Sequence, residues 1–278
     1  MANVEVRQEL LNIVPEGVPV ERSYLLQKGF SVHALDNLVK SGQLESLAHG
    51  VYARPKTNIT WQGVVRGLQN FPKRELTVGG LTALEMQGLG HYLPMGKKKT
   101  AHIFGVENLP LWVNKILPDV TFVYHKTNTF KEYTDVRGYD PITREVGDAL
   151  FPFEESGGAH PLIISSPAAA ILEVLLDVPE KISFEHADQL MQGLTTLSPK
   201  RVQSVLESCK NVKAKRLFLW LAERNNHAWF KKLDLSRIDL GTGHRSLAKG
   251  GKFDSKYKIT VPEDMWTKTA STTSKSNY

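Results

Sequence analysis

Three polar side chains at helical spacing could form hydrogen bonds with nucleic acid. His33, Asn37 and Lys40 fall four and three residues apart, while Leu35 and Leu38 mark the opposite, apolar face of the same predicted helix. Amide and imidazole groups on an exposed helix face can exchange hydrogen bonds with base edges in a DNA major groove. We therefore expect Asn37 and His33 to read bases.

Basic residues around this helix could contact DNA phosphates, which position a protein but carry no sequence information. They are Arg22, Lys28, Lys40, Arg54 and Lys56. Residues 1–56 nevertheless hold six basic and six acidic side chains, whereas residues 196–278 hold seventeen and seven, a net charge of +10. Because nucleic-acid affinity comes largely from counterion release, any strong contact is expected to recruit the C-terminal region as well. A solvated basic helix face is the alternative interpretation of that region.

Catalytic patterns are weak. Asp119 and Lys126 flank a predicted strand, as in some metal-dependent nucleases, but Tyr124 stands where such a site needs a second carboxylate. The single cysteine, Cys209, lies in a predicted helix and is expected to be buried and inert. The sequence holds no GxxxxGK[ST], CxxC or HExxH motif. We therefore expect no cofactor, no metal and no enzymatic activity.

The elements that position the base-reading side chains are predicted to be short. A helix over 21–28 ends at Gly29, a second begins with Ser31 as its N-cap and closes at Gly42, and a hairpin over 44–52 turns at His49-Gly50. A first helix from about Asn3 to Val14 ends at the prolines that come next. Together, residues 1–56 are predicted to fold as a winged helix-turn-helix, with a protein-docking module as the alternative.

The rest of the chain, residues 57–266, is predicted to be a larger domain, giving an α+β protein overall. It is mixed α and β to about residue 165 and mainly helical afterwards, and residues 267–278 form a polar tail expected to be disordered. Helices are predicted at 61–68, 81–86, 168–176, 184–194, 199–209 and 214–224, strands at 100–106, 120–125 and 256–261, and a helix or turn at 109–116. No apolar run suits a membrane span or a signal peptide, so we expect a cytoplasmic protein.

Two stretches resemble a known family. Residues 24–31, 35–44 and 50–52 (YLLQKGFS, LDNLVKSGQL and GVY) are similar to the N-terminal domain of the AbiEi family, the antitoxin and autorepressor components of bacterial type IV toxin–antitoxin systems. Residues 80–89 (GLTALEMQGL) are similar to the start of that family's second domain. The two motifs in this order are far more specific than either alone.

The resemblance implies two functions. The winged domain would bind inverted repeats in its own promoter, as a monomer in solution that binds DNA cooperatively, and the C-terminal domain would neutralise a nucleotidyltransferase-like toxin, with or without direct contact. By position, the helix from Ser31 to Lys40 would enter the groove and the His49-Gly50 hairpin would touch the flanking backbone. The candidate DNA-binding residues are Arg22, Ser23, Lys28, Ser31, His33, Asn37, Lys40, His49, Arg54 and Lys56.

The basic C-terminal third adds a candidate antitoxin or nucleic-acid backbone surface, made of Lys213, Lys215, Arg216, Lys231 and Lys232. Two other functions stay open from sequence. One is a ligand-responsive regulator whose second domain senses a small molecule. The other is a DNA-targeted nuclease that uses Asp119 and Lys126.

Overall fold

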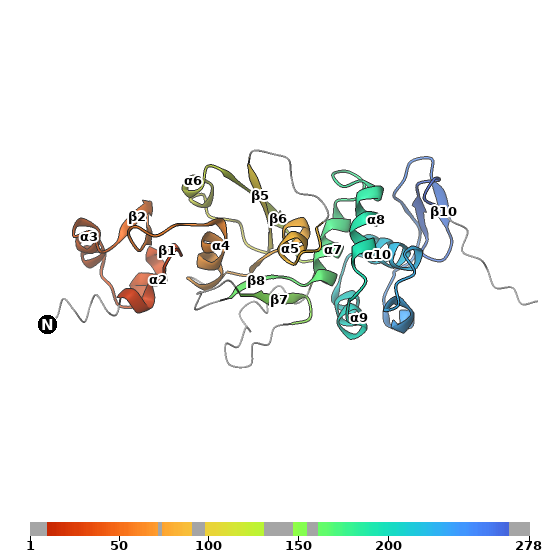
Figure 1. Cartoon of the computed structure of the whole chain (residues 1–278), viewed down its shortest axis with the longest axis horizontal. Coiled ribbons are helices and arrows are strands. Elements are labelled where there is room, and N and C mark those ends of the chain that lie inside the picture. Colours follow the sequence, from red (N-terminus) through yellow and green to blue (C-terminus); the bar gives the residue numbers. More distant parts are fainter. Residues whose placement is uncertain (1–9, 72–73, 91–97, 131–146, 155–160, 267–278) are drawn as a thin grey trace, which may run out of the picture.

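The computed structural model describes residues 10–71, 74–90, 98–130, 147–154 and 161–266. The molecule is elongated, and its parts succeed one another in sequence order (Figure 1). A small N-terminal unit lies at one end, a five-stranded sheet in the middle, and a group of helices and then a small sheet at the other end. The predicted tail, 267–278, lies outside the described residues, as do residues 3–9 of the predicted first helix.

The N-terminal unit is a winged helix-turn-helix fold, as predicted. Residues 10–13 are helical, and α2 (Arg22–Gln27) and α3 (Val32–Lys40) come next. The strands β1 (Val20–Glu21), β2 (Glu45–Ala48) and β3 (Val51–Ala53) form an antiparallel sheet in the order β1-β3-β2. The apolar residues that mark the inner faces of these elements meet in one buried cluster, which includes Val14, Leu25, Leu35, Leu38 and Tyr52.

Local sequence signals explain why these elements begin and end where they do. The Ser31 hydroxyl accepts a hydrogen bond of 3.1 Å from the Ala34 N–H, which is the predicted N-cap of α3. Gly29, after α2, has φ +93°, and Gly50, in the hairpin turn, has φ +71°. A side chain at either position would be strained, so Gly29 permits the turn between α2 and α3 and Gly50 permits the hairpin turn between β2 and β3.

The middle of the molecule is a mixed sheet with the strand order β6-β5-β4-β8-β7. The strands are β4 (Leu76–Val78), β5 (Lys99–Gly105), β6 (Val120–Lys126), β7 (Leu150–Phe153) and β8 (Leu162–Ser165). The pairs β5·β6 and β4·β8 are parallel, while β4·β5 and β7·β8 are antiparallel. In the described part of this region, the sheet is accompanied by the helices α4 (Trp61–Asn70), α5 (Gly80–Met86), α6 (Val113–Ile116) and α7 (Pro167–Leu176).

The C-terminal part is mainly helical, as predicted. It contains α8 (Phe184–Gly193), α9 (Pro199–Ser208) and α10 (Val212–Arg224), two 3-10 turns, η2 (Phe230–Lys232) and η3 (Leu235–Arg237), and a sheet in the order β10-β11-β9. Its strands are β9 (Arg245–Ser246), β10 (Lys252–Asp254) and β11 (Ile259–Val261). Among the described residues, every helix is too short or too polar to cross a bilayer.

The N-terminal unit is joined to the middle of the molecule by polar contacts of Glu21. Arg74 pairs with the Glu21 carboxylate at 2.9 Å, and the Trp112 indole N–H donates to Glu21 Oε1 at 2.9 Å. All three side chains are half-buried. Because Glu21 belongs to β1 while its partners lie beyond α4, these bonds fix the winged unit against the sheet domain.

Candidate nucleic-acid interface

The outer face of α3 is exposed and polar. His33, Asn37 and Lys40 are all exposed, whereas Leu35 and Leu38 are buried beneath them. In Figure 1, α3 lies at the end of the molecule farthest from the C-terminal helices. The two predicted base-reading side chains and Lys40, a predicted phosphate contact, therefore lie together on one accessible surface.

Two further side chains share this surface and were not among the sequence-predicted residues. Val32, in the first turn of α3, is 47% exposed, although its side chain is apolar. Asp36 is also exposed and lies three residues after His33, on the same face. A valine can contact a thymine methyl group and an aspartate can accept a hydrogen bond from cytosine N4. Their exposure on a helix packed on its other side is the signal that could have identified them.

The hairpin is held next to α2 by Arg22. The Arg22 guanidinium donates to the Tyr52 hydroxyl from Nε at 3.3 Å and from Nη2 at 3.2 Å, and the Arg22 N–H donates to the Gly50 carbonyl at 2.8 Å. His49, at the tip of the hairpin, is exposed. Arg22 positions the wing and is only half-buried, so it is not closed off from solvent.

The remaining predicted phosphate contacts differ in their surroundings. Ser23, Lys28 and Lys56 are exposed, and the Lys28 ammonium lies 5.4 Å from the centre of the Tyr24 ring. Arg54 instead forms hydrogen bonds inside the winged unit, because its guanidinium donates to the carbonyls of Leu11 and, at 2.5 Å, of Val14. Arg54 therefore closes the end of the first helix, a role that its sequence neighbours do not reveal.

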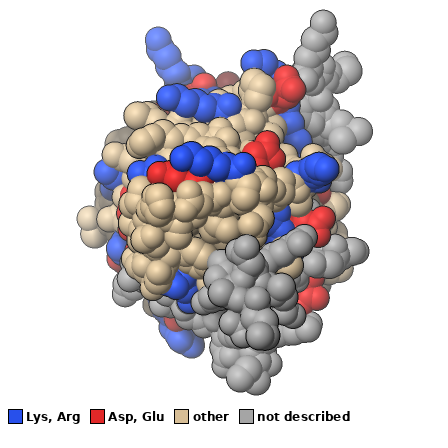
Figure 2. Space-filling view, turned by 90° about the vertical axis from the view of Figure 1, so that its left-hand side faces the viewer, with Lys and Arg blue, Asp and Glu red and all other residues tan. Residues whose placement is uncertain are grey.

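The charge on this end of the molecule is dispersed. Figure 2, which faces the N-terminal end, shows Lys and Arg side chains separated by uncharged residues and accompanied by Asp and Glu, on the part of this face that described residues form. No continuous basic patch is visible there. This agrees with the equal numbers of basic and acidic residues in 1–56.

The predicted basic surface of the C-terminal third requires a correction. Lys215 and Arg216 are 3% and 1% exposed, and the Arg216 guanidinium donates to the carbonyls of residues 240–243 and 258 at 2.7–3.4 Å. Lys213 donates to the carbonyls of Leu176 and Val178 at 2.8 and 2.7 Å. These three cations lie at the start of α10, whose residues 214–222 are all buried, so they stabilise the fold.

Lys231 and Lys232, in η2, are exposed. Only these two of the five predicted basic residues therefore remain as candidates for a surface contact.

The nuclease alternative is not supported by the geometry. Asp119 precedes β6 and Lys126 ends it, so the strand separates them by roughly 20 Å at about 3.3 Å per residue. The Tyr124 hydroxyl between them donates to the Glu107 carbonyl, and burial, together with the smaller effect of the Glu107 charge, raises the pKa of Tyr124 to about 12. Within the described ranges, no group of three or more His, Cys, Asp or Glu side chains could hold a metal ion.

Cys209 is 2% exposed, and its burial raises the pKa of its thiol. A buried thiol whose pKa is raised is a poor nucleophile. The predicted structural role of this cysteine therefore fits its surroundings.

Comparison with known proteins places both parts of the chain in one family. A family model described as "Transcriptional regulator, AbiEi antitoxin N-terminal domain" matches residues 4–95, and one described as "Transcriptional regulator, AbiEi antitoxin, Type IV TA system" matches residues 98–262. Among solved structures, the RV2827C protein from Mycobacterium tuberculosis is similar, with 18% identity, a TM-score of 0.49, and coverage of 91% of this chain and 89% of that chain. No curated protein matches the chain.

Proposed function

The chain belongs to the AbiEi antitoxin family of transcriptional regulators of type IV toxin–antitoxin systems, and we propose that it binds inverted repeats in its own promoter and neutralises a nucleotidyltransferase-class toxin. The observation that carries the DNA-binding part is the exposed polar face of α3 on a winged unit. Neither function needs catalysis, and we propose that the protein is not an enzyme.

In the proposed complex, α3 enters the major groove and the hairpin lies along the backbone beside it. Asn37 pairs with an adenine through both groups of its amide, His33 and Asp36 contact neighbouring bases, and Val32 packs against a thymine methyl group. Ser31 lies at the N-terminus of α3, where the end of the helix can face a phosphate. The proposed base contacts therefore include His33 and Asn37, which were predicted from sequence, and Val32 and Asp36, which were identified by their exposure in the structure.

Backbone contacts in the proposed complex come from side chains around α3. Lys28, Lys40 and Lys56 are exposed, and Ser23 and His49 lie on the flanking α2 and hairpin. Arg22, which is half-buried, contributes a further contact from the base of the wing. Arg54 contributes indirectly, because it holds the first helix in place.

Fluorescence anisotropy tests this proposal. The full chain is titrated onto its own upstream DNA and onto a scrambled duplex at several salt concentrations, and we expect tighter binding to the native sequence at every salt concentration. Asn37→Ala should lower the discrimination between the two by about 1–3 kcal/mol. Lys40→Ala should instead weaken binding to both equally and make the salt dependence shallower.

Lys181→Ala is the matched control, because it removes one exposed positive charge between α7 and α8, far from α3 (Figure 1), where Lys181 pairs with Asp177. It should leave both affinities unchanged. If Asn37→Ala leaves the discrimination intact, α3 does not read bases. If wild-type protein does not distinguish the two duplexes at all, the winged unit has a docking or sensing role.

A further inference from the structure

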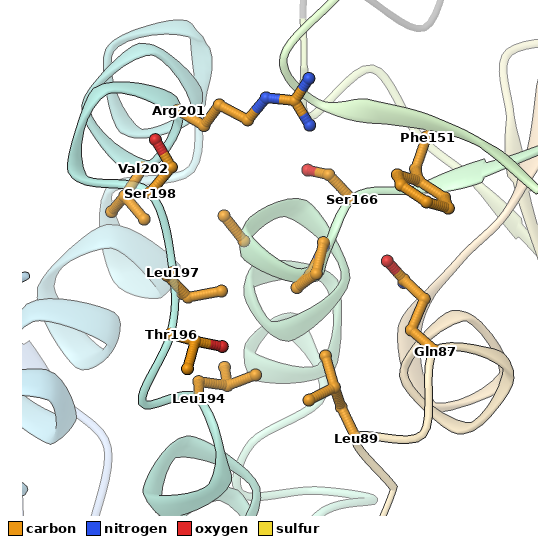
Figure 3. A pocket seen from close by; sticks show the side chains of 12 residues that line it. Gln87, Leu89, Phe151, Ser166, Leu194, Thr196, Leu197, Ser198, Arg201 and Val202 are labelled. Atoms are coloured by element: carbon orange, nitrogen blue, oxygen red, sulfur yellow. The ribbon is translucent and has the colours of Figure 1, made fainter.

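A small cavity lies where the middle sheet meets the C-terminal helices. It has a volume of about 230 Å³, and its lining comes from the segment after α5, from β7, from the start of α7, from α9 and from the segment before α9. Most of the lining is apolar, including Leu89, Leu194 and Leu197 (Figure 3). The cavity is far from the exposed face of α3, so a ligand bound in it would be independent of the proposed DNA contacts.

Two helices begin at this cavity with free N-terminal ends. α7 starts after Ser166 and α9 after Ser198; each helix has ten residues and a proline in its first turn, and neither serine side chain caps its helix. The first hydrogen bonds of the two helices are donated by Ala170 and Val202, at 2.8 and 3.0 Å. The earlier N–H groups have no partner within the helix, and both helix dipoles place partial positive charge at the cavity.

The Ser166 hydroxyl points to a ligand independently of the helix ends. Ser166 is 2% exposed, its Oγ has no hydrogen-bond partner, and it lines the cavity. Figure 3 shows this oxygen directed into the open space between α7 and α9. Buried hydroxyl groups are nearly always hydrogen-bonded, so an unpaired one that faces a cavity indicates that a polar group can occupy it.

Arg201, in the first turn of α9, provides a full positive charge. Figure 3 shows its side chain extending over the mouth of the cavity towards Ser166. Its Nε lies 3.6 Å from Asp148 Oδ1, and its side chain is 52% exposed. The carboxylate of Asp148 offsets part of the positive charge, so the site suits a single negative charge better than the double charge of a phosphate monoester.

We propose that this cavity binds a small organic carboxylate with an apolar body. The carboxylate accepts hydrogen bonds from Ser166 and Arg201 at the two helix N-termini, and the apolar body packs among Leu89, Leu194 and Leu197. A cavity of about 150 Å³ can hold benzene, so a volume of about 230 Å³ suits a body that is a short chain or one ring. A charge held by a guanidinium and helix N–H groups over an apolar cavity gives selectivity for an amphipathic anion.

Isothermal titration calorimetry on the full chain tests the site with hexanoate and benzoate. Hexanol and benzyl alcohol, which share the apolar bodies but lack the charge, and inorganic phosphate, which lacks the body, serve as comparison ligands. We expect at least one carboxylate to bind about tenfold more tightly than its alcohol and than phosphate. Equal affinity for carboxylate and alcohol, or no binding of any carboxylate, overturns the proposal.

Three variants test the assigned contacts. Arg201→Gln and Ser166→Ala should each weaken carboxylate binding about tenfold, while binding of the alcohol changes little. Lys200→Gln is the matched control, because it removes the neighbouring exposed charge on α9, which does not line the cavity. Its affinity should equal that of the wild type. Ser166→Ala removes an unpaired hydroxyl and should fold normally; unchanged carboxylate binding in both Arg201→Gln and Ser166→Ala would place any observed binding elsewhere.

Discussion

Two glycines of α4 allow the segment that leads into the winged unit to pack closely against this helix. A Cβ atom on Gly63 would lie 2.2 Å from the Gly17 carbonyl oxygen, and one on Gly67 would lie 2.3 Å from that of Pro19. Both obstacles are backbone atoms of the segment that leads from the first helix into β1. We predict that alanine at either position pushes this segment, and the winged unit with it, away from α4.

The magnitude results from two opposing effects. Carbon–oxygen contacts of this kind are normally about 3.3–3.6 Å, so the backbone of residues 17–19 would have to retreat by about 1 Å. Val18 is buried in the core of the winged unit, so the segment cannot move freely, and overpacking of this kind costs about 1–3 kcal/mol. The better helix propensity of alanine returns about 1 kcal/mol. Each single substitution should therefore lower the free energy of unfolding by up to about 2 kcal/mol.

Urea denaturation, monitored by circular dichroism, measures the effect. The double variant Gly63→Ala/Gly67→Ala should cost less than the sum of the two single variants, because one displacement of residues 17–19 relieves both overlaps. Gln62→Ala, in the same turn of α4, is the control and should change stability by less than about 0.5 kcal/mol. If both glycine variants are more stable than the wild type by about 1 kcal/mol, α4 does not contact this segment closely and the predicted overlap is refuted.

Three further predictions concern the rest of the chain. His102 and His125 share a hydrogen bond of 2.9 Å. Burial lowers the pKa of His102 from 6.5 to about 4 and also lowers the pKa of His125. The unfolded chain therefore binds protons first, so the free energy of unfolding should fall as the pH drops from about 6.5 to about 4, and His102→Gln should flatten this dependence in urea titrations. Arg216→Met leaves several buried carbonyls unpaired and should destabilise the protein by about 3 kcal/mol or more by thermal denaturation; a loss below about 1 kcal/mol would contradict the assigned contacts. Lys231→Gln/Lys232→Gln should preserve promoter discrimination but reduce rescue of cells that express the toxin, whereas loss of specific DNA binding would make η2 part of the DNA surface.

Local signals were sufficient to predict most helices. The N-cap of α3 and the glycine after α2 act within a few residues, so the sequence predicts these elements close to their observed bounds. The strands β7 and β8 were missed for physical reasons. β8 is a short strand buried throughout, without the alternation that marks a half-exposed strand, and β7 contains Pro152, which is tolerated there because β7 lies at the edge of the sheet.

The candidate site shows the same division between local and long-range information. Helical periodicity was enough to predict the exposed face of α3, because the apolar residues of α3 mark its buried side. The partners of Arg54 and Arg216 lie about 40 and at least 24 residues away in sequence, so no pattern around either arginine reveals that its charge is used inside the fold. From the sequence, both arginines are expected at the surface. In the structure, both donate hydrogen bonds to backbone carbonyls and so stabilise the fold.

The number of exposed cations on the winged unit sets how strongly its DNA affinity should depend on salt. With Arg54 engaged in the fold, the exposed cations in described residues 10–56 are Lys28, Lys40 and Lys56, and the exposed acids there are Glu16, Asp36 and Glu45. Three phosphate contacts give a dependence of log K on log salt of only about −3. One winged unit would therefore gain little affinity from counterion release. Two copies on an inverted repeat would double both the phosphate contacts and the bases read. Cooperative binding by this neutral unit therefore requires a slope of about −5 on the full repeat, against about −3 on a half-site.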